Sequence, residues 1–76
     1  MIEEFSVAQF LVDGTYEYIA RRVGAEEAVH AAKLATESLG AQTGLVTRLI
    51  ITDSGDNTIF EWKHGEGVTY PPRDSK

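Results

Sequence analysis

Two glutamates stand out among the residues whose type and spacing could support chemistry. Glu17 and Glu61 each lie between two aromatic residues, in the triplets Tyr16-Glu17-Tyr18 and Phe60-Glu61-Trp62. Because side chains alternate along a strand, each glutamate should point away from the face that carries its two rings. If the two strands were neighbours, both glutamates would share one face with two cations. The residues predicted to bind a small ligand on that face are Glu17, Glu61, Arg21 and Lys63.

Such a group of charges supports two interpretations. Two carboxylates beside a cation can transfer protons, but only where a pocket removes water from one of them. On an open sheet face the same residues form cross-strand ion pairs, each worth about a few tenths of a kcal/mol. We favour the second interpretation.

The other polar motifs predict structure and not catalysis. The segment Asp53-Ser54-Gly55-Asp56-Asn57 is rich in oxygen ligands, but it lacks the spacing of a calcium loop and is typical of a turn. His30 and His64 are the only histidines, and neither lies in a metal-binding motif. Gly65-Glu66-Gly67 lacks the strand-to-helix context of a dinucleotide site. We therefore predict no catalytic residue, no metal and no cofactor, and an enzyme is the less favoured class.

The elements that must position these residues are two hairpins around one helix. Asp13-Gly14 predicts a two-residue type I′ turn, which needs positive φ at both positions. Residues 53–57 predict the second hairpin turn. The predicted strands cover residues 5–11, 15–23, 45–52 and 58–63, with a short edge strand possible at 68–70.

The predicted helix runs from Ala25 to about Leu39, with Gly24 as its N-cap and Gly40 as the left-handed residue that ends it. Residues 41–44 are then a linker. The apolar stripe of this helix is made largely of alanine, so bulky partners are expected beneath it. The aromatic residues placed under the helix are Tyr16, Tyr18, Phe60 and Trp62.

These elements predict an α+β fold of the order ββαββ, with a mostly antiparallel four-stranded sheet and one helix packed on one face. Residues 1–70 form a single domain in this interpretation, and residues 71–76 form a polar C-terminal tail. A chain of 76 residues buries only about 60% of its unfolded surface on folding, so its core is marginal. It has no cysteine, and self-association is therefore an attractive source of stability.

Aliphatic residues indicate where a second copy would bind. Leu49-Ile50-Ile51 must place at least one large side chain on each face of a strand. A single helix cannot cover both faces of the sheet, so the uncovered face should bind another molecule. The residues predicted on that interface are Ile19, Ile50 and Ile59.

Net charge argues against some partners. The chain carries 12 acidic and 7 basic residues, for a net charge of −5, and its basic residues are scattered along the sequence. We therefore expect neither a nucleic acid nor an anionic membrane as partner. No apolar run approaches the roughly 18 residues of a membrane span, and the first residues do not resemble a secretory signal. The expected compartment is the cytoplasm.

The leading functional hypothesis is a small non-enzymatic interaction module, homodimeric, that acts through an exposed sheet face or edge. The alternative is a small-molecule binding protein or weak enzyme, with a dimer cleft anchored by Glu17 and Glu61. A third hypothesis is an adaptor to a larger enzyme complex.

Overall fold

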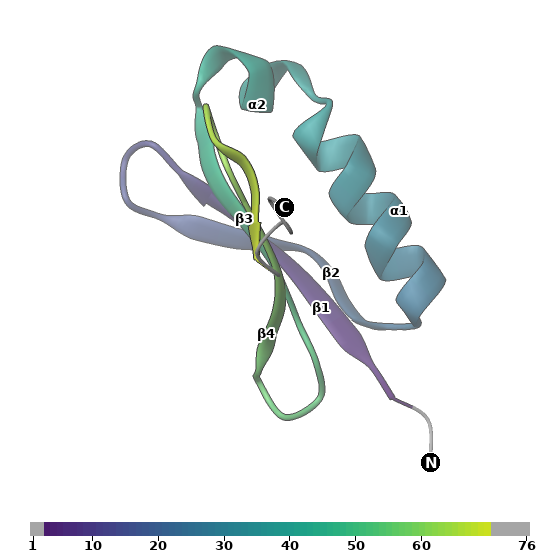
Figure 1. The fold of residues 1–76 in the computed structure, drawn as a ribbon. Helices are drawn as coiled ribbons and strands as arrows, with labels where there is room; N and C mark the ends of the chain where they lie inside the picture. The colour runs from purple at the N-terminus through teal and green to yellow at the C-terminus, as the bar shows by residue number, and fades with distance from the viewer. Residues whose placement is uncertain (1–2, 71–76) are drawn as a thin grey trace, which may run out of the picture.

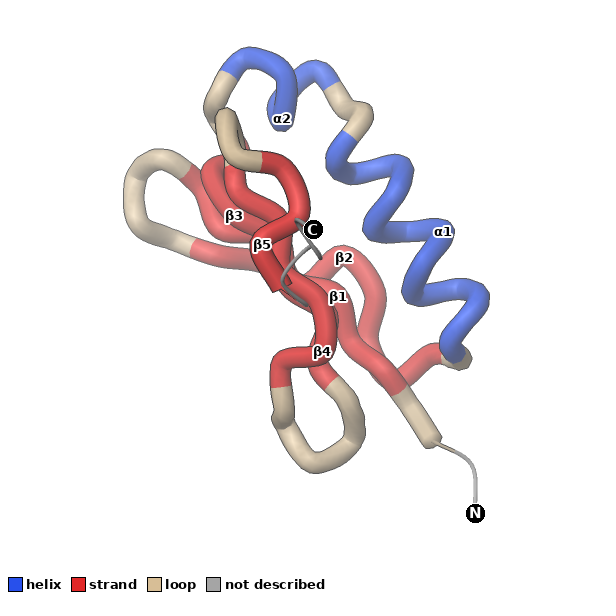
Figure 2. Tube along the Cα trace, viewed as in Figure 1, coloured by secondary structure: helices blue, strands red, loops and turns tan. Residues whose placement is uncertain are grey.

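The computed structural model describes residues 3–70, which form one antiparallel sheet and two helices (Figures 1 and 2). The spatial order of the strands is β2-β1-β3-β4-β5. The predicted tail at residues 71–76 lies outside the described residues. Along the chain the elements are β1 (Phe5–Leu11), β2 (Tyr16–Val23), α1 (Ala25–Thr36), α2 (Leu39–Thr43), β3 (Val46–Thr52), β4 (Thr58–Lys63) and β5 (Gly67–Tyr70).

The α+β class and the antiparallel pairing agree with the sequence prediction, whereas the number of elements does not. The sheet has five strands in the described part of the chain, because Gly67–Tyr70 forms a strand, β5, that pairs with β4. Neither helix between residues 3 and 70 has the length and apolar character needed to cross a membrane.

The second helix corrects the predicted end of the first. α1 begins after Gly24 as predicted, but it ends at Thr36 and not at Leu39. The Ser38 side chain accepts a hydrogen bond from the amide of Ala41 at 3.2 Å, which makes Ser38 the N-cap of α2. Gly40 lies inside α2, and the left-handed residue that ends the helical region is Gly44, at φ 89°.

The first hairpin turn also differs from the prediction. The amide of Leu11 donates to the carbonyl of Thr15 at 2.7 Å, and the amide of Gly14 donates to the carbonyl of Leu11 at 2.9 Å. Gly14 has positive φ, at 92°, and Asp13 does not. The loop is therefore three residues long and ends in a left-handed glycine, which shifts the register of β2 by one residue from that of a type I′ hairpin.

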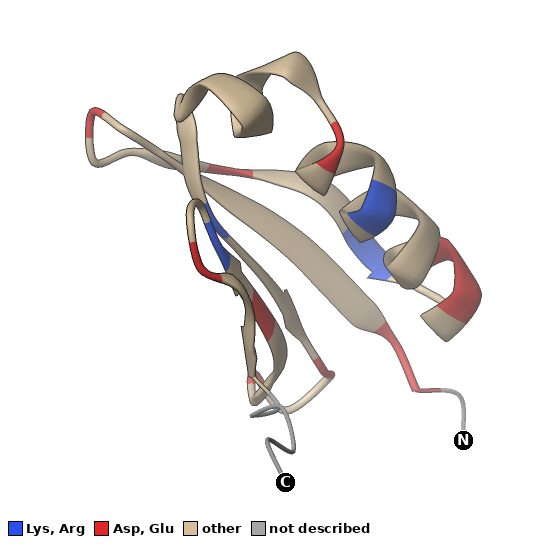
Figure 3. Ribbon diagram, turned by 45° about the horizontal axis from the view of Figure 1, so that its top comes forward, with Lys and Arg blue, Asp and Glu red and all other residues tan. Residues whose placement is uncertain are grey.

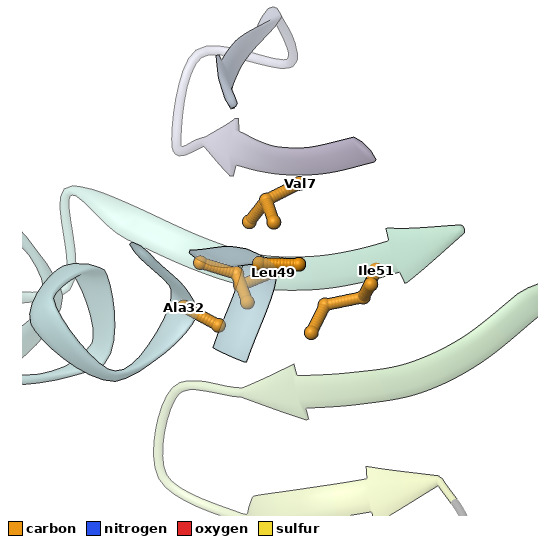
Figure 4. Packing of buried hydrophobic residues seen from close by; sticks show 5 residues of the cluster. Val7, Ala32, Leu49 and Ile51 are labelled. Carbon is orange, nitrogen blue, oxygen red and sulfur yellow. The ribbon is translucent and has the colours of Figure 1, made fainter. Parts of the chain in front are cut away.

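The core lies between α1 and the middle of the sheet (Figure 4). Val7 of β1 and Leu49 of β3 are fully buried, and they pack with Ile51 against Ala28 and Ala32 of α1. The alanine side chains allow α1 to lie close to β1, β2 and β3, as predicted from its small apolar stripe. Phe60 and Trp62 of β4 pack against the same core, so their predicted placement on the helix side is correct.

The predicted placement of Tyr16 and Tyr18 under the helix is wrong. In the observed register Tyr18 pairs with Ala8 and Tyr16 pairs with Phe10, and these partners alternate with the buried Val7. Cross-strand partners share a face, so both tyrosines lie on the side of the sheet away from α1. We call this side the outer face.

The predicted positions of two isoleucines are reversed, Ile19 by the shifted register of the first hairpin and Ile59 by a bulge. Val7 pairs with Ala20 while Ala8 pairs with Tyr18, which leaves Ile19 as an extra residue in β2. Ile19 lines a hollow with Ala31 and Ala35 of α1, so it is on the helix side.

The second bulge is in β4. Ile51 pairs with Phe60 and Thr52 pairs with Thr58, so Ile59 is the extra residue. Ile59 lines a small cavity with Ala25 and Ala28, again on the helix side. Of the three isoleucines predicted on the uncovered face, only Ile50 lies there.

Candidate functional site

The outer face is the part of the molecule that brings most candidate residues together. Ile50 alternates with the buried Leu49 and Ile51 and therefore points away from α1. Each of the other four strands places one residue beside Ile50 or beside the neighbour of Ile50, so that a line of outward-facing side chains crosses the whole sheet. This line of residues, the central row, consists of Tyr18, Ala8, Ile50, Glu61 and Tyr70.

A second row lies beside the central row and contains Tyr16, Phe10, Arg48 and Lys63. The rings of Phe10 and Tyr16 are in contact with each other, and Tyr16 also contacts Tyr18 of the central row. The ring centroids of Phe10 and Tyr16 are 5.4 Å apart, and those of Tyr16 and Tyr18 are 6.0 Å apart, distances at which aromatic pairs attract.

Two guanidinium groups stack on these rings. The Arg48 guanidinium carbon lies 4.9 Å from the centroid of Phe10, and that of Arg21 lies 4.6 Å from the centroid of Tyr18. Stacked cations of this kind keep their hydrogen-bonding edges accessible while the planar group is held in place. The outer face therefore combines flat apolar rings with oriented cations.

Ala8 shows that this surface is already closely packed. It is only 4% exposed although it points to the uncovered side of the sheet. Its neighbours in the central row are the larger Tyr18 and Ile50, and the side chains around it exclude water from the alanine. Tyr16 and Tyr18 themselves remain 57% and 47% exposed. The two tyrosine rings are thus accessible to a partner, while the alanine beneath them is buried.

Glu61 is the acidic member of the central row. Thr69 donates a hydrogen bond from Oγ1 to Oε1 at 2.8 Å, and the Nε of Arg48 forms an ion pair with Oε2. The Thr69 hydrogen bond, followed by the hydrogen bond and charge of Arg48, lowers the pKa of Glu61. The carboxylate is therefore ionised at neutral pH and is suited to accepting hydrogen bonds, not to donating a proton.

The structure does not bring Glu17 and Glu61 together. Glu17 accepts a hydrogen bond from Nε2 of Gln9 at 2.6 Å, and Gln9 pairs across to the buried Leu49, so Glu17 is on the helix side. Three strand spacings separate β2 from β4, or about 14 Å. The predicted pair of carboxylates on one face is therefore not formed within a single chain.

The cations predicted with those glutamates are both on the outer face. Lys63 pairs with Arg48 in the second row, and its charge also contributes to the lowered pKa of Glu61. Arg21 stacks on Tyr18 at the opposite edge of the sheet. The site therefore keeps three of the four predicted polar residues but divides them between its two edges.

The histidines and the aspartate-rich turn have structural roles or are solvated. Nδ1 of His64 lies 2.8 Å from the carbonyl oxygen of Ala41, which ties the β4–β5 turn to α2. His30 is exposed on α1. Asp53 accepts hydrogen bonds from the amides of Gly55 and Asn57, as expected for a turn residue. Within residues 3–70 no group of three or more His, Cys, Asp or Glu side chains is placed to hold a metal ion.

Sequence reasoning missed Phe10, Arg48 and the outward position of both tyrosines. A type I′ turn at Asp13-Gly14 would pair Gln9 with Tyr18, and so place Tyr18 on the helix side. The observed three-residue loop moves the pairing by one residue and reverses the face. The signal that could have identified this register is the cross-strand match of Phe10 with Tyr16 and of Gln9 with Glu17.

Comparison of the chain with protein-family models, curated proteins and solved structures found no match. The function must therefore be argued from the outer face itself.

Proposed function

We propose that this protein is a non-enzymatic interaction module that forms a homodimer through its outer face. The observation that supports this most directly is the central row. It presents Tyr18 and Tyr70, 47% and 46% exposed, on either side of Ile50, and no second layer covers them in the described part of the chain. Burying large aromatic side chains is the main source of energy in most protein interfaces.

A second copy is the favoured partner because the two rows are complementary to themselves. β3 is the middle strand of the five, so a two-fold axis along β3 would place Ile50 opposite its own copy. In the central row the small Ala8 would then face the long Glu61 of the second molecule, and Tyr18 would face Tyr70. Twisted sheets diverge at their corners, where these large rings would fill the space.

The second row is complementary in the same arrangement. Tyr16 would face Gly67, which pairs with Lys63 and has no side chain. Phe10 would face Lys63, a favourable contact between a cation and a ring. The two copies of Arg48 would meet near the axis, each already paired with a Glu61 carboxylate. Ala8 with Glu61 and Tyr16 with Gly67 thus set a small residue against a large one, and Phe10 with Lys63 sets a ring against a cation.

A dimer through the edge of β2 is less favourable. β2 contains the bulge at Ile19 and a left-handed residue at Arg22, φ 58°. Irregularities of this kind twist an edge strand away from regular pairing with another molecule. The face offers a continuous surface of about 500 Å² on each copy, from five strands spaced about 4.8 Å apart. A total near 1,000 Å² is at the lower limit for a specific interface, so we expect a micromolar dissociation constant.

Sedimentation equilibrium over a micromolar concentration range tests the proposal. The wild-type chain should show reversible dimerisation, and Ile50→Lys should be monomeric because two lysines would meet at the axis. Leu34→Lys is the matched control. Leu34 is 56% exposed on α1, and its substitution should leave the dimer intact.

Circular dichroism should first confirm that both variants fold. A wild-type chain that is monomeric throughout the range would contradict the proposal and leave the outer face to a different protein. Equal loss of dimer in Leu34→Lys would also contradict it, because the contact would then involve the helix side.

A further inference from the structure

A polar cavity of about 310 Å³ lies at one end of the outer face, between β2 and the β3–β4 turn. Its two walls carry opposite charges. Arg21 and Arg22 form the wall on β2, with Glu4 paired to Arg22 beside them, and Asp53 and Asp56 form the wall on the turn. Figure 3 shows this division, with basic residues at the end of β2 and acidic residues in the β3–β4 turn. The hydroxyl groups of Ser6 and Thr52 line the cavity between the walls.

The basic wall depends on an unusual backbone conformation. Consecutive residues of a strand normally point to opposite faces, which would separate Arg21 from Arg22. Arg22 instead has φ 58°, the left-handed region that L-residues other than glycine, asparagine and aspartate rarely adopt. This break in the strand allows both arginines to line the same cavity. Backbone strain kept at a surface of this kind is typical of functional positions.

Short contacts hold the basic wall in place. The amide of Arg22 donates to Oγ of Ser6 at 3.2 Å, and Nε of Arg22 donates to Oε1 of Glu4 at 3.1 Å. The guanidinium of Arg21 stacks 4.6 Å above the ring of Tyr18. These contacts orient both guanidinium groups and leave their terminal nitrogen atoms able to donate to a carboxylate.

The acidic wall is held by the turn. Oδ1 of Asp53 accepts hydrogen bonds from the backbone amides of Gly55 and Asn57. Hydrogen bonding, chiefly from the backbone of Asn57, lowers the pKa of Asp53. Asp53 is therefore an anion at neutral pH, and the hydrogen bonds among residues 3–70 do not use its Oδ2. Asp56 also has positive φ, at 63°, and is exposed next to it.

We propose that this cavity binds a small zwitterion of the α-amino acid class, with its carboxylate on Arg21 and Arg22 and its ammonium group on Asp53 and Asp56. A ligand with only negative charge would be repelled by the aspartates, and one with only positive charge by the arginines. A molecule that carries both charges can form ion pairs with the arginines and with the aspartates at the same time. The volume is at the small end of the range for ligand sites, about 300–1,000 Å³, which suits a single amino acid.

Binding can be followed by ¹⁵N–¹H correlation spectra of the full chain titrated with L-glutamine. Saturable shifts should appear at the amides around Ser6, Arg22 and Asp56. Acetate and methylammonium, which each carry half of the charge pattern, should bind at least about tenfold more weakly. Shifts of the same size and affinity with either half-ligand, or no saturable shift at millimolar L-glutamine, would overturn the proposal.

Three variants test whether L-glutamine binds in this cavity. Arg21→Gln and Asp56→Asn should each weaken binding about tenfold, since each removes a charge-assisted hydrogen bond; asparagine also tolerates the left-handed conformation of residue 56. Lys33→Gln, on α1, is the control and should bind as the wild type does. Unchanged affinity in both cavity variants would refute the assignment.

The titration is repeated on Ile50→Lys, which separates this cavity from the proposed dimer. Binding that persists in a monomeric variant places the ligand in the cavity of a single chain. Binding that is lost with the dimer would contradict a site built from one chain.

Discussion

Arg22 is the residue at which local strain can be tested most directly. Its left-handed backbone costs an L-residue about 1–2 kcal/mol, whereas glycine adopts it freely. Arg22→Gly should therefore raise the free energy of unfolding by about 0.5 kcal/mol, after the extra entropy of the unfolded glycine is subtracted. The lost ion pair with Glu4 contributes little, because the Arg22 side chain is 78% exposed.

The neighbouring residue is the control for this prediction. Arg21 has ordinary strand geometry, so Arg21→Gly should lower the free energy of unfolding by about 0.5–1 kcal/mol. Urea denaturation followed by circular dichroism measures both changes. Opposite signs for two adjacent arginines are expected, and the same sign for both would show that Arg22 is not strained.

Glu61 makes stability depend on acidity. Its folded-state pKa is lowered, first by the Thr69 hydrogen bond and then by Arg48, so the folded protein favours the ionised form more than the unfolded chain does. This contribution is fully present above the ordinary value of 4.5 and is lost as the pH falls through the lower folded-state pKa. The free energy of unfolding should therefore decrease with acidification below about pH 4.5.

Two substitutions test that assignment. Glu61→Gln removes the titrating group, and Thr69→Val removes the hydrogen bond that lowers its pKa most. Both variants should lose less stability than the wild type between neutral and acidic pH, as measured by urea denaturation at each pH. Identical slopes in all three proteins would mean that other carboxylates, such as Asp13 and Asp53, account for the acid sensitivity.

At the scale of elements, Ser38 determines where one helix stops and the next begins. Its Oγ donates to the carbonyl of Ala35 at 2.7 Å and accepts from the amide of Ala41 at 3.2 Å. Ser38→Ala should lower the free energy of unfolding by about 1 kcal/mol, because one hydroxyl serves both helix ends. Ser38→Thr keeps the hydroxyl and should restore most of the loss in urea denaturation; an equal loss in both would argue against capping.

The same region shows what a sequence can and cannot predict about an element. The start of α1 at Gly24 and Ala25 was correctly predicted, because two glutamates follow in the first turn. Its end was not, because Gly40 and Gly44 are both plausible left-handed residues and Ser38 starts a second helix between Thr36 and Gly44. Composition alone does not rank two candidate C-terminal glycines four residues apart.

Strand faces were predicted well only where neither a bulge nor the length of a hairpin loop altered the pairing. Leu49-Ile50-Ile51 lies in regular strand, and the expected division of its side chains between the two faces is confirmed. Ile59 is the extra residue of a bulge, and simple alternation from Glu61 assigns it to the wrong face. Ile19 shares the face of Glu17, and the three-residue loop of the first hairpin places both on the helix side. A bulge leaves no compositional mark in either strand. The site built on Glu17 and Glu61 fails for a different reason, the hairpin register, for which the match of Gln9 with Glu17 is a signal in the sequence.

For the whole molecule, the class and the antiparallel pairing were predictable because turn residues and β-branched runs are local signals. The spatial order β2-β1-β3-β4-β5 was not, because it depends on β1 pairing with β3 across the entire helical segment. That pairing puts β3 at the centre, and it is the reason that Ile50 lies in the middle of the outer face. Local patterns thus determine the elements, and one long-range pairing determines the binding surface.

The central position of β3 also predicts where the molecule is most vulnerable. Val7 and Leu49 are the largest fully buried side chains between residues 3 and 70, so few contacts can compensate for the loss of either. A chain of this size has about 5 kcal/mol of stability, and truncating a buried leucine costs about 2–5 kcal/mol. Leu49→Ala should therefore retain at most about 3 kcal/mol of stability and unfold at a much lower urea concentration than the wild type.

Leu39→Ala is the matched control, because Leu39 is 75% exposed and its truncation should change stability by no more than about 0.5 kcal/mol. Urea denaturation at a fixed protein concentration compares the two variants without interference from dimerisation. If Leu49→Ala were as stable as Leu39→Ala, the core could not lie between α1 and β3. The outward direction of Ile50 depends on the inward direction of Leu49, so the proposed dimer surface would fail with it.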